Sequence, residues 1–392
     1  MKKIVFTEEF CSPENLFPFT LTRQIQDIRV GILTIREKWE HYLGFPSFDK
    51  NEGDYKDQDR AITIDESIGD DIIYLIHGNI LPTPSLVKQV LKLKPGQFLS
   101  LAEKESIVYC ISKNEVAGPD NIRVSRAVDV KEEIREIKFP WDIFQKNHWA
   151  IEKDFELLTK GRKSARISST NKLKKPGNIF IEKGAQVEHC FLNATDGPIY
   201  IGKNALVMEG SMLRGPLSIG EGAVVKMGAR IYGATTIGPY CTVGGEIKNA
   251  VFFSYSNKAH DGYVGDAVIG EWCNLGAGTS NSNMKNNASV VQIWTPHGTV
   301  SAGMKCGLFM GDYSKTAINT SINTGTVIGV CANVFGQGLT PKYIPSFSWG
   351  SEGVERYEFD KALSDIQNWK ALKDGSLFEN EKKLLKHIFD HY

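Results

Sequence analysis

A six-residue phrase recurs in the second half of the chain and constrains the fold more than any other feature. Three gapless copies begin at Ile201, Ile219 and Ile237. Each reads aliphatic residue, glycine, two variable residues, a small residue and then further apolar or β-branched residues. Related phrases occur near Ile269 and Val327. The 18-residue interval between the three starts equals three hexapeptides, and such a period indicates a solenoid in which each repeat packs on its neighbours.

The composition of the phrase explains how one coil closes. The aliphatic side chain points into a narrow interior, glycine permits the sharp turn, and a small Ala or Cys fits four places on. Three hexapeptides make one triangular coil, and adjacent coils stack at the β-sheet spacing of ~4.8 Å. A β-sandwich with Gly-rich turns is the alternative, but it does not require identical placement of small residues in three gapless repeats. We therefore predict a parallel β-helix.

The remaining chain divides around this β-helix, since 392 residues are too many for one ordinary core. We predict an α/β domain over residues 1–135, a linker over 136–178 with a helix at about 142–158, the β-helix over 179–345 and a helical segment over 346–392. The apolar spacing of the last segment suits a face packed on the β-helix or on a neighbouring subunit.

Short apolar runs define elements within the first domain. They predict strands at Lys3–Thr7, Ile72–Ile76 and Ser106–Ile111, and helices at Arg36–Leu43 and Ser85–Leu93. Strands mixed with short helices indicate the α/β class for this part of the chain.

Composition argues against several kinds of partner. Lys plus Arg equals Asp plus Glu, at 46 each, so net charge gives no reason to expect nucleic acid or an anionic membrane. A basic stretch over residues 160–175 lacks interleaved aromatic residues, and we interpret it as a solvated linker. No apolar run reaches the ~20 residues of a transmembrane helix, and the chain start leaves no room for a signal peptide's apolar core. We expect a cytoplasmic protein.

A coil of 18 residues also predicts which side chains lie above one another. Arg230 and Lys248 differ by 18 and are expected to stack on neighbouring coils. Two cations ~5 Å apart repel each other unless an anion lies beside them. A sugar phosphate would satisfy both, with Arg as a planar fork and Lys as a point charge. Spacing alone leaves open the alternative of two solvated surface charges.

The segment that follows departs from the repeat. It contains Lys258-Ala259-His260 and Tyr263-Val264-Gly265-Asp266, after which the repeat resumes and leads to Asn274-Leu275-Gly276-Ala277-Gly278-Thr279. This order resembles the acetyltransferase half of the bifunctional bacterial enzyme that makes UDP-N-acetylglucosamine from glucosamine 1-phosphate. The resemblance covers about residues 200–283. It implies a left-handed winding of the β-helix, which periodicity alone does not fix.

The resemblance implies roles for individual residues, carried over position by position. His260 falls on the catalytic base of the family. Ala277 falls where the backbone meets the acetyl-CoA thioester, with Gly278 beside it. The positions that hold the amino-sugar phosphate fall on Arg230, Lys248, Tyr263, Asn274 and Asn283.

The residue types suit acyl transfer. A neutral imidazole, with an ordinary pKa of about 6.5, can accept the proton of an attacking amine at cytosolic pH. Backbone N–H groups around Gly276-Ala277-Gly278 are suited to stabilise the tetrahedral oxyanion. The resemblance weakens at Ile293–Gly298, which interrupts the repeat, so coenzyme A contacts past residue 290 are not predicted.

The first domain resembles a worn form of the sugar nucleotidyltransferase opening, in a divergent, Bacteroidetes-like branch of the bifunctional family. In residues 16–33 the family's loop glycines are absent, and Arg29 stands where a Lys is expected. In residues 77–82, Asn79 replaces the family's magnesium-binding Asp and removes a charge that a hard cation prefers. The resemblance implies nucleotide binding by Arg23, Arg29 and Asn79, with UTP and Mg²⁺ if the domain is active. A domain retained for packing or regulation is the alternative.

The leading hypothesis is thus an acetyl-CoA-dependent N-acetyltransferase of an amino-sugar phosphate, with glucosamine 1-phosphate favoured and nucleotidyl transfer to UDP-N-acetylglucosamine as a further activity. The resemblance also implies a homotrimer.

Two other hypotheses stay open. One is a noncatalytic sugar-nucleotide sensor or scaffold. The other is a hexapeptide-repeat enzyme with zinc on three histidines, for which the β-helix region offers only His189, His260 and His297, in different coil registers. The seven cysteines are scattered without close pairs, so we expect reduced thiols, no disulfide framework and no metal site.

Overall fold

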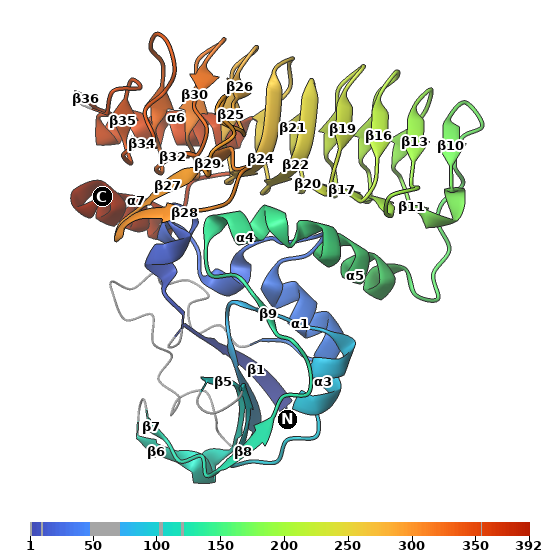
Figure 1. Ribbon diagram of the computed structural model, residues 1–392, viewed down its shortest axis with the longest axis vertical. Helices are drawn as coiled ribbons and strands as arrows, with labels where there is room; N and C mark the ends of the chain where they lie inside the picture. The colour runs from blue at the N-terminus through green and yellow to red at the C-terminus, as the bar shows by residue number, and fades with distance from the viewer. Residues whose placement is uncertain (1, 9–10, 48–70, 102–104, 119–120, 354) are drawn as a thin grey trace. The chain divides into compact units, whose positions relative to one another are not determined.

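The structure of the chain is a computed structural model (Figure 1) that forms two compact units. The described residues are 2–8, 11–47, 71–101, 105–118, 121–353 and 355–392. The first unit comprises residues 1–13, 23–28 and 33–138, and the second comprises residues 14–22, 29–32 and 139–392. Two short N-terminal segments therefore pack with the C-terminal part of the chain.

The first unit contains a mixed five-stranded sheet. In spatial order its strands are β1 (Lys2–Thr7), β2 (Ile72–His77), β5 (Glu105–Ile111), β4 (Gln97–Leu101) and β8 (Arg126–Asp129). The pairs β1–β2 and β4–β8 are parallel, whereas β2–β5 and β4–β5 are antiparallel. Buried residues on these strands, among them Val5, Ile73 and Ile111, form a small core. The three predicted strands are confirmed.

Two helices with capped starts accompany this sheet. Helix α1 (Ile35–Leu43) follows Thr34, whose hydroxyl accepts from the Glu37 N–H in a capping box. Helix α3 (Pro84–Val90) follows Thr83, which caps it in the same way. Both predicted helices are confirmed. Two strand pairs complete the unit, namely β3 (Ile80–Leu81) with β9 (Arg135–Glu136), and β6 (Val116–Gly118) with β7 (Asn121–Ile122).

The second unit is dominated by a parallel β-helix, visible in Figure 1 as a row of short strands. We number its three faces in chain order within a coil. Face 1 is formed by β11 (Ile179–Ile181), β14 (Ile199–Ile201), β17 (Leu217–Ile219), β20 (Thr235–Ile237), the ends of β22 (Glu246–Phe252) and β24 (Tyr263–Ile269), β29 (Leu308–Met310), β32 (Thr326–Ile328) and β34 (Tyr343–Ile344).

The other two faces repeat this arrangement. Face 2 is formed by β12 (Gln186–Val187), β15 (Leu206–Val207), β18 (Val224–Val225), β21 (Thr242–Val243), β23 (Asn257–Lys258), β25 (Asn274–Leu275), β30 (Lys315–Thr316), β33 (Asn333–Val334) and β35 (Ser348–Trp349), with β36 (Glu355–Arg356) antiparallel at its edge. Face 3 is formed by β10 (Lys172–Lys174), β13 (Phe191–Asn193), β16 (Met212–Arg214), β19 (Arg230–Tyr232), the starts of β22 and β24, β26 (Ser280–Asn281) and β31 (Ser321–Ile322).

The 18-residue repeat is confirmed by the strand register. Ile201, Ile219 and Ile237 pair directly across three coils and are fully buried. Small residues such as Ala223 and Cys241 are also fully buried, as the phrase requires. Each buried Ile side chain contributes roughly 1.5–3 kcal/mol by leaving water, so a continuous aliphatic column stabilises the β-helix along its length. The predicted order of an α/β domain, a β-helix and C-terminal helices is confirmed.

One excursion interrupts the coils. After β26 the chain leaves the β-helix and forms the antiparallel hairpin of β27 (Gln292–Thr295) and β28 (Gly298–Ser301) before it returns at β29. The register resumes across the excursion, because Val268 pairs with Phe309. The predicted interruption at Ile293–Gly298 is confirmed.

Face 1 is covered by helices α4 (Pro140–Gln145) and α5 (Asn147–Thr159), which run along the β-helix in Figure 1. We predicted one helix here, and the structure has two, separated at Lys146. The break coincides with the buried amide of Asn147. Its Oδ1 accepts from the Gly31 N–H at 2.7 Å and from the Thr236 hydroxyl at 3.2 Å, and so joins one N-terminal segment to face 1.

Helices α6 (Phe359–Ala371) and α7 (Glu379–His391) pack on the later coils of the β-helix. The Phe347 ring meets the Phe389 ring edge-on, with centroids 5.0 Å apart. Lys370 forms a 2.6 Å ion pair with Glu381 and lies over the Trp272 ring. The predicted packing of the C-terminal segment on the β-helix is confirmed. No helix among the described residues combines the length and apolar character needed to cross a bilayer.

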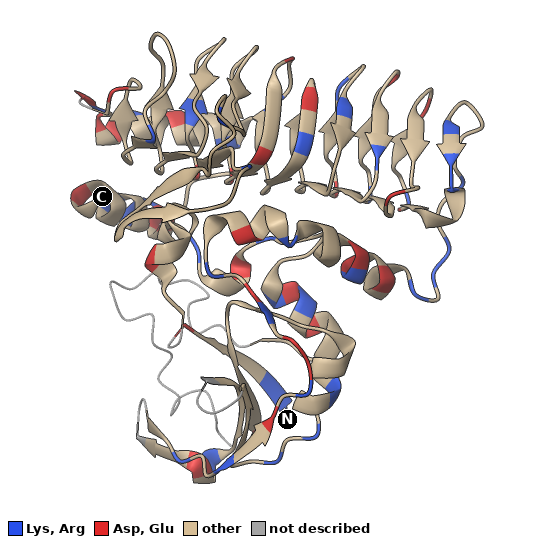
Figure 2. Cartoon of the chain, viewed as in Figure 1, with Lys and Arg blue, Asp and Glu red and all other residues tan. Residues whose placement is uncertain are grey.

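The basic stretch runs between α5 and β10, where Figure 2 shows Lys and Arg residues in succession. The guanidinium of Arg162 pairs with Glu182 at 2.7 Å and lies over the Phe180 ring. That part of the stretch packs on the first coil of the β-helix.

Candidate functional site

The predicted site residues lie where the coils become shorter than 18 residues. On face 3, Arg230 pairs with Glu246, and Glu246 pairs with Tyr263. The coils that begin at Arg230 and Glu246 therefore have 16 and 17 residues. The prediction that Arg230 and Lys248 stack is wrong, because Lys248 pairs with Tyr232.

The shortening occurs at the corner between faces 2 and 3. Four residues, 226–229, connect β18 to β19, but only Gly244 and Gly245 connect β21 to β22. A Cβ on Gly244 would lie 2.5 Å from the Ala259 carbonyl oxygen, and one on Gly245 would lie 2.8 Å from that of Gly262. Only glycine fits at these contacts, and the pair lets residues 259–262 lie directly over the corner.

The short coil places a carboxylate beside the predicted anion-binding arginine. Arg230 Nε lies 3.8 Å from Glu246 Oε2, and Arg230 Nη2 lies 4.0 Å from Asp261 Oδ1. About half of the Arg230 side chain is exposed, so these pairs are weak and leave the guanidinium able to bind another anion. The Tyr232 hydroxyl donates to Glu246 Oε1 at 2.7 Å and thereby orients this carboxylate.

Lys248 lies on the same face, on the Tyr232 side of the column. Its Nζ is 5.7 Å from the centroid of the Tyr232 ring. Hydrogen bonding to Glu246 raises the pKa of Tyr232, so this phenol stays protonated. Arg230, Glu246 and Lys248 thus form a surface that alternates in charge.

Tyr263 is held by a buried polar network. The Asn283 Nδ2 group donates to the Tyr263 hydroxyl at 3.1 Å and to Asp266 Oδ2 at 2.5 Å. Asn249 donates to the other Asp266 oxygen at 2.6 Å. Burial raises the pKa of Tyr263 to about 12, so its hydroxyl is protonated and suited to donate to a ligand. Asn283 lies behind Tyr263, and its predicted contact with substrate remains a prediction.

His260 lies on the exposed turn after β23. Lys258 Nζ donates to the His260 carbonyl at 2.6 Å and to the Asp261 carbonyl at 3.2 Å. The Asp261 carbonyl also accepts from the Gly278 N–H at 2.9 Å. This chain of bonds connects the backbone of the predicted base to the predicted acetyl-CoA residues.

The backbone donors around Ala277 are not equivalent. The Gly276 N–H is bonded to Thr316, and the Gly278 N–H to Asp261. The Ala277 N–H has no acceptor within the part of the chain that the structure describes. Of the three predicted oxyanion donors, Ala277 is therefore the one left for a ligand.

Asn274 lies on a different face from the other predicted sugar-phosphate residues. It pairs with Asn257 and Lys315 on face 2, whereas Arg230 and Tyr263 lie on face 3. Within one chain, Asn274 and Arg230 are thus not brought onto one surface.

The three predicted nucleotide-binding residues divide between the units. Arg23 and Asn79 belong to the first unit and Arg29 to the second. Asn79 is buried and donates to Glu136 at 3.3 Å, and Arg29 donates to the Ile32 carbonyl. Their nucleotide-binding role stays a prediction.

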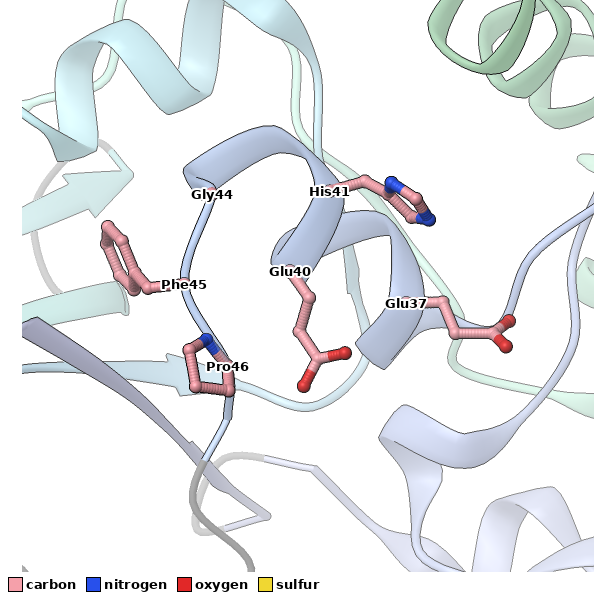
Figure 3. A pocket seen from close by; sticks show the side chains of 6 residues that line it. All are labelled: Glu37, Glu40, His41, Gly44, Phe45 and Pro46. Atoms are coloured by element: carbon pink, nitrogen blue, oxygen red, sulfur yellow. The ribbon is translucent and has the colours of Figure 1, made fainter.

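A surface pocket in the first unit is formed by α1 and the turn that follows it (Figure 3). Its lining residues are Glu37, Glu40, His41, Gly44, Phe45 and Pro46. Glu40 accepts from both the N–H and the hydroxyl of Ser47, at 2.8 and 2.7 Å. None of the predicted nucleotide-binding residues lines this pocket.

Sequence reasoning missed the contributions of Glu246, Asp266 and Lys258. Glu246 enters the site only through the short coil, and the Gly244-Gly245 pair was the signal that could have revealed it. Among the described residues, no group of three or more His, Cys, Asp or Glu side chains is arranged to hold a metal ion.

Comparison with known proteins confirms the resemblance noted in the sequence. Residues 4–163 match the family described as sugar nucleotidyl transferase. The chain is 36% identical over 91 residues to a bifunctional sugar-1-phosphate nucleotidylyltransferase/acetyltransferase of Sulfurisphaera tokodaii, over 23% of each chain. It is 28% identical over 204 residues to the bifunctional protein GlmU of Methanococcus maripaludis, over 50% of this chain and 41% of the relative. The chain thus spans less than half the length of these relatives.

A solved structure is also similar in part. The UDP-N-acetylglucosamine acyltransferase of Arabidopsis is 15% identical, with a TM-score of 0.26, over 58% of this chain and 97% of that one.

Proposed function

We propose that this chain, which is similar to bifunctional sugar-1-phosphate nucleotidyltransferase/acetyltransferases, transfers an acetyl group from acetyl-CoA to the amine of an amino-sugar phosphate. Glucosamine 1-phosphate is the favoured acceptor. The observation that best supports this is the link from His260 through Asp261 to Gly278, beside the unoccupied Ala277 N–H. A base and an oxyanion donor are thereby held on connected backbone.

The charges beside this link suit an acceptor that carries both signs. An amino-sugar phosphate has an anionic phosphate and, before it reacts, a cationic ammonium. Arg230 and Lys248 offer cations to the phosphate, and Glu246 offers a carboxylate to the ammonium. The Tyr263 hydroxyl adds a neutral donor.

In the proposed reaction the neutral amine attacks the thioester carbonyl carbon. His260 accepts the amine proton, and the Ala277 N–H donates to the carbonyl oxygen as it becomes an oxyanion. The C–S bond then breaks and the thiolate of coenzyme A leaves, to be protonated by solvent or by His260. The amide of the N-acetyl sugar phosphate is the other product.

The decisive experiment measures thiol release from acetyl-CoA with glucosamine 1-phosphate. Replacing His260 with Asn removes the proton acceptor, and activity is expected to fall by at least ~100-fold. His189→Asn is the matched control, because His189 is exposed on an earlier coil, and it is expected to retain activity. A wild type that releases no thiol would refute the proposal. Binding of a UDP-sugar without turnover would then favour the sensor hypothesis, and stoichiometric zinc in the purified protein would favour the zinc enzyme.

Arg230 provides a second test on the acceptor side. Arg230→Gln is expected to raise KM for the amino-sugar phosphate about 10- to 100-fold, because a charge-assisted hydrogen bond contributes roughly 1.5–3 kcal/mol. Arg214→Gln is the control, since Arg214 lies on face 3 and pairs with Asp196 at 3.1 Å. Equal effects of both variants would contradict a specific anion site at Arg230.

We also propose a homotrimer. Asn274 and Arg230 lie on different faces of one chain, so a site that uses both requires neighbouring copies. Exposed apolar side chains support such contacts: Met227 and Ile318 are 71% and 69% exposed, and Phe191 and Met212 are 52% and 54% exposed. Sedimentation equilibrium tests this, and a monomer would contradict the shared site.

Nucleotidyl transfer is the second candidate function, favoured by the family match over residues 4–163. Pyrophosphate release from UTP and N-acetylglucosamine 1-phosphate with Mg²⁺ tests it. No release would indicate that the first unit has kept the fold without the reaction, in keeping with Asn at position 79.

A further inference from the structure

Lys258 occupies an interior position of the β-helix. It pairs with Val243 on face 2, and Val225 and Val207 hold the same position in the preceding coils. All three valines belong to the apolar interior. The Lys258 side chain is 0% exposed. One ammonium group is therefore enclosed in a column that is otherwise aliphatic through these coils.

The ammonium is held by backbone carbonyls. Its two hydrogen bonds go to the carbonyl oxygens of His260 and Asp261, at 2.6 and 3.2 Å. Among the described residues it forms no ion pair. Burial of a charge without a paired carboxylate is unfavourable. Filling the interior does not require a lysine, because valine does so in the neighbouring coils.

Both carbonyls belong to the turn that presents His260. The Asp261 carbonyl also accepts from the Gly278 N–H at 2.9 Å. From inside the β-helix, Lys258 thus fixes the backbone of His260 and joins it to the residue that follows Ala277. Without this donor the His260 carbonyl loses its bond to the interior, and the turn loses a constraint on its conformation.

We propose that Lys258 is a positioning residue for acyl transfer. It contacts neither substrate, and acts by holding the His260 imidazole in a fixed orientation relative to the Ala277 N–H. This inference rests on the proposed function, because the orientation of His260 affects a rate only if His260 is the base.

The test replaces Lys258 with Met, which keeps the length of the side chain and removes its donors. We expect kcat to fall at least ~10-fold while KM for both substrates stays within about 2-fold. Thermal stability should be unchanged or higher, because a buried charge is removed. Lys258→Gln retains an N–H donor and is expected to recover part of kcat. In a His260→Asn background, Lys258→Met should cause no further loss.

A residue that only supports the fold would give a different pattern, in which activity and melting temperature fall together and Lys258→Met adds to His260→Asn. That pattern would overturn the inference. So would full activity of Lys258→Met in a protein whose His260→Asn variant is inactive, and this result would leave the proposed function intact. A wild type without thiol release would overturn the proposed function, and the inference with it.

Amide hydrogen exchange of the unliganded protein provides a readout that does not need turnover. Residues 259–262 and the Gly278 N–H are expected to exchange at least ~10-fold faster in Lys258→Met than in the wild type. Exchange at the same rate in both proteins would overturn the positioning role.

Discussion

Replacing Lys258 with methionine should change the stability of the β-helix by an amount that depends on pH. Burial lowers the pKa of Lys258 from 10.5 to about 8 in the folded chain, so the unfolded chain holds this proton more tightly. Between pH 8 and 10.5 the unfolded state therefore binds more protons, and stability contributed by this group rises with pH. Below pH 8 the full penalty of the buried charge applies.

The size of this penalty follows from the shift. About 2.5 pKa units at roughly 1.4 kcal/mol each give about 3 kcal/mol at pH 7. At pH 10 most of the folded lysine is neutral, and about 1 kcal/mol of the penalty remains. The methionine variant has no such term, so its stability relative to the wild type should be about 2 kcal/mol more favourable at pH 7 than at pH 10.

Urea denaturation of both proteins at pH 7 and pH 10, at one ionic strength and one protein concentration, measures this difference. Hydrogen bonds lost by the variant lower its stability at both pH values and largely cancel in the comparison. Lys183→Met removes an exposed lysine and controls for the change in net charge. A stability difference between Lys258→Met and wild type that is the same at both pH values would refute the reasoning.

Three further predictions concern the architecture. Gly31→Ala is expected to destabilise the protein by more than about 2 kcal/mol, because φ is +82° and the new Cβ would lie 2.5 Å from a buried carboxylate oxygen; Gly161→Ala, with φ +73° and open space, should cost only about 1 kcal/mol, and equal losses on denaturation would contradict the steric account. Ile219→Ala should cost about 2–5 kcal/mol by leaving a cavity, whereas Met227→Ala, at a 71% exposed position, should stay within ~0.5 kcal/mol; calorimetry of the pair decides this. All seven cysteines are free and six are buried, and burial raises the pKa of Cys241 to about 12, so a thiol reagent at pH 8 should label fewer than about one thiol per folded chain and seven after denaturation; fast labelling of several thiols in the folded protein would contradict this packing.

The repeat was predictable because each coil states its own structure. Ile201, Ile219 and Ile237 occupy identical local phrases, and one period is enough to place them above one another. The strands and helices of the first unit were also readable from local apolar runs and caps. These features depend on neighbours in sequence, and local patterns report them well.

Contacts between distant residues were less accessible. Nothing near Gly31 announces that its N–H will bond to Asn147, and nothing in an amphipathic stretch announces a break at Lys146. The pairing of Arg230 with Glu246 depends on the number of residues at one corner, so counting by 18 gave the wrong partner. Lys258 was visible as part of a motif, but its inward direction follows only from its register with Val243. The roles of the site residues remain predictions for the experiments above.

A solenoid with a constant period has translational symmetry along its axis, and no position on such a surface differs chemically from the position one coil away. The Gly244-Gly245 corner acts as a dislocation in this lattice. Beyond it the columns are out of phase, and unlike side chains face one another for the first time. A change of two residues in a connection, with no new element of structure, is thus enough to create a unique address on a repetitive scaffold. Moving the same deletion to another corner would shift that address along the axis in steps of one strand spacing.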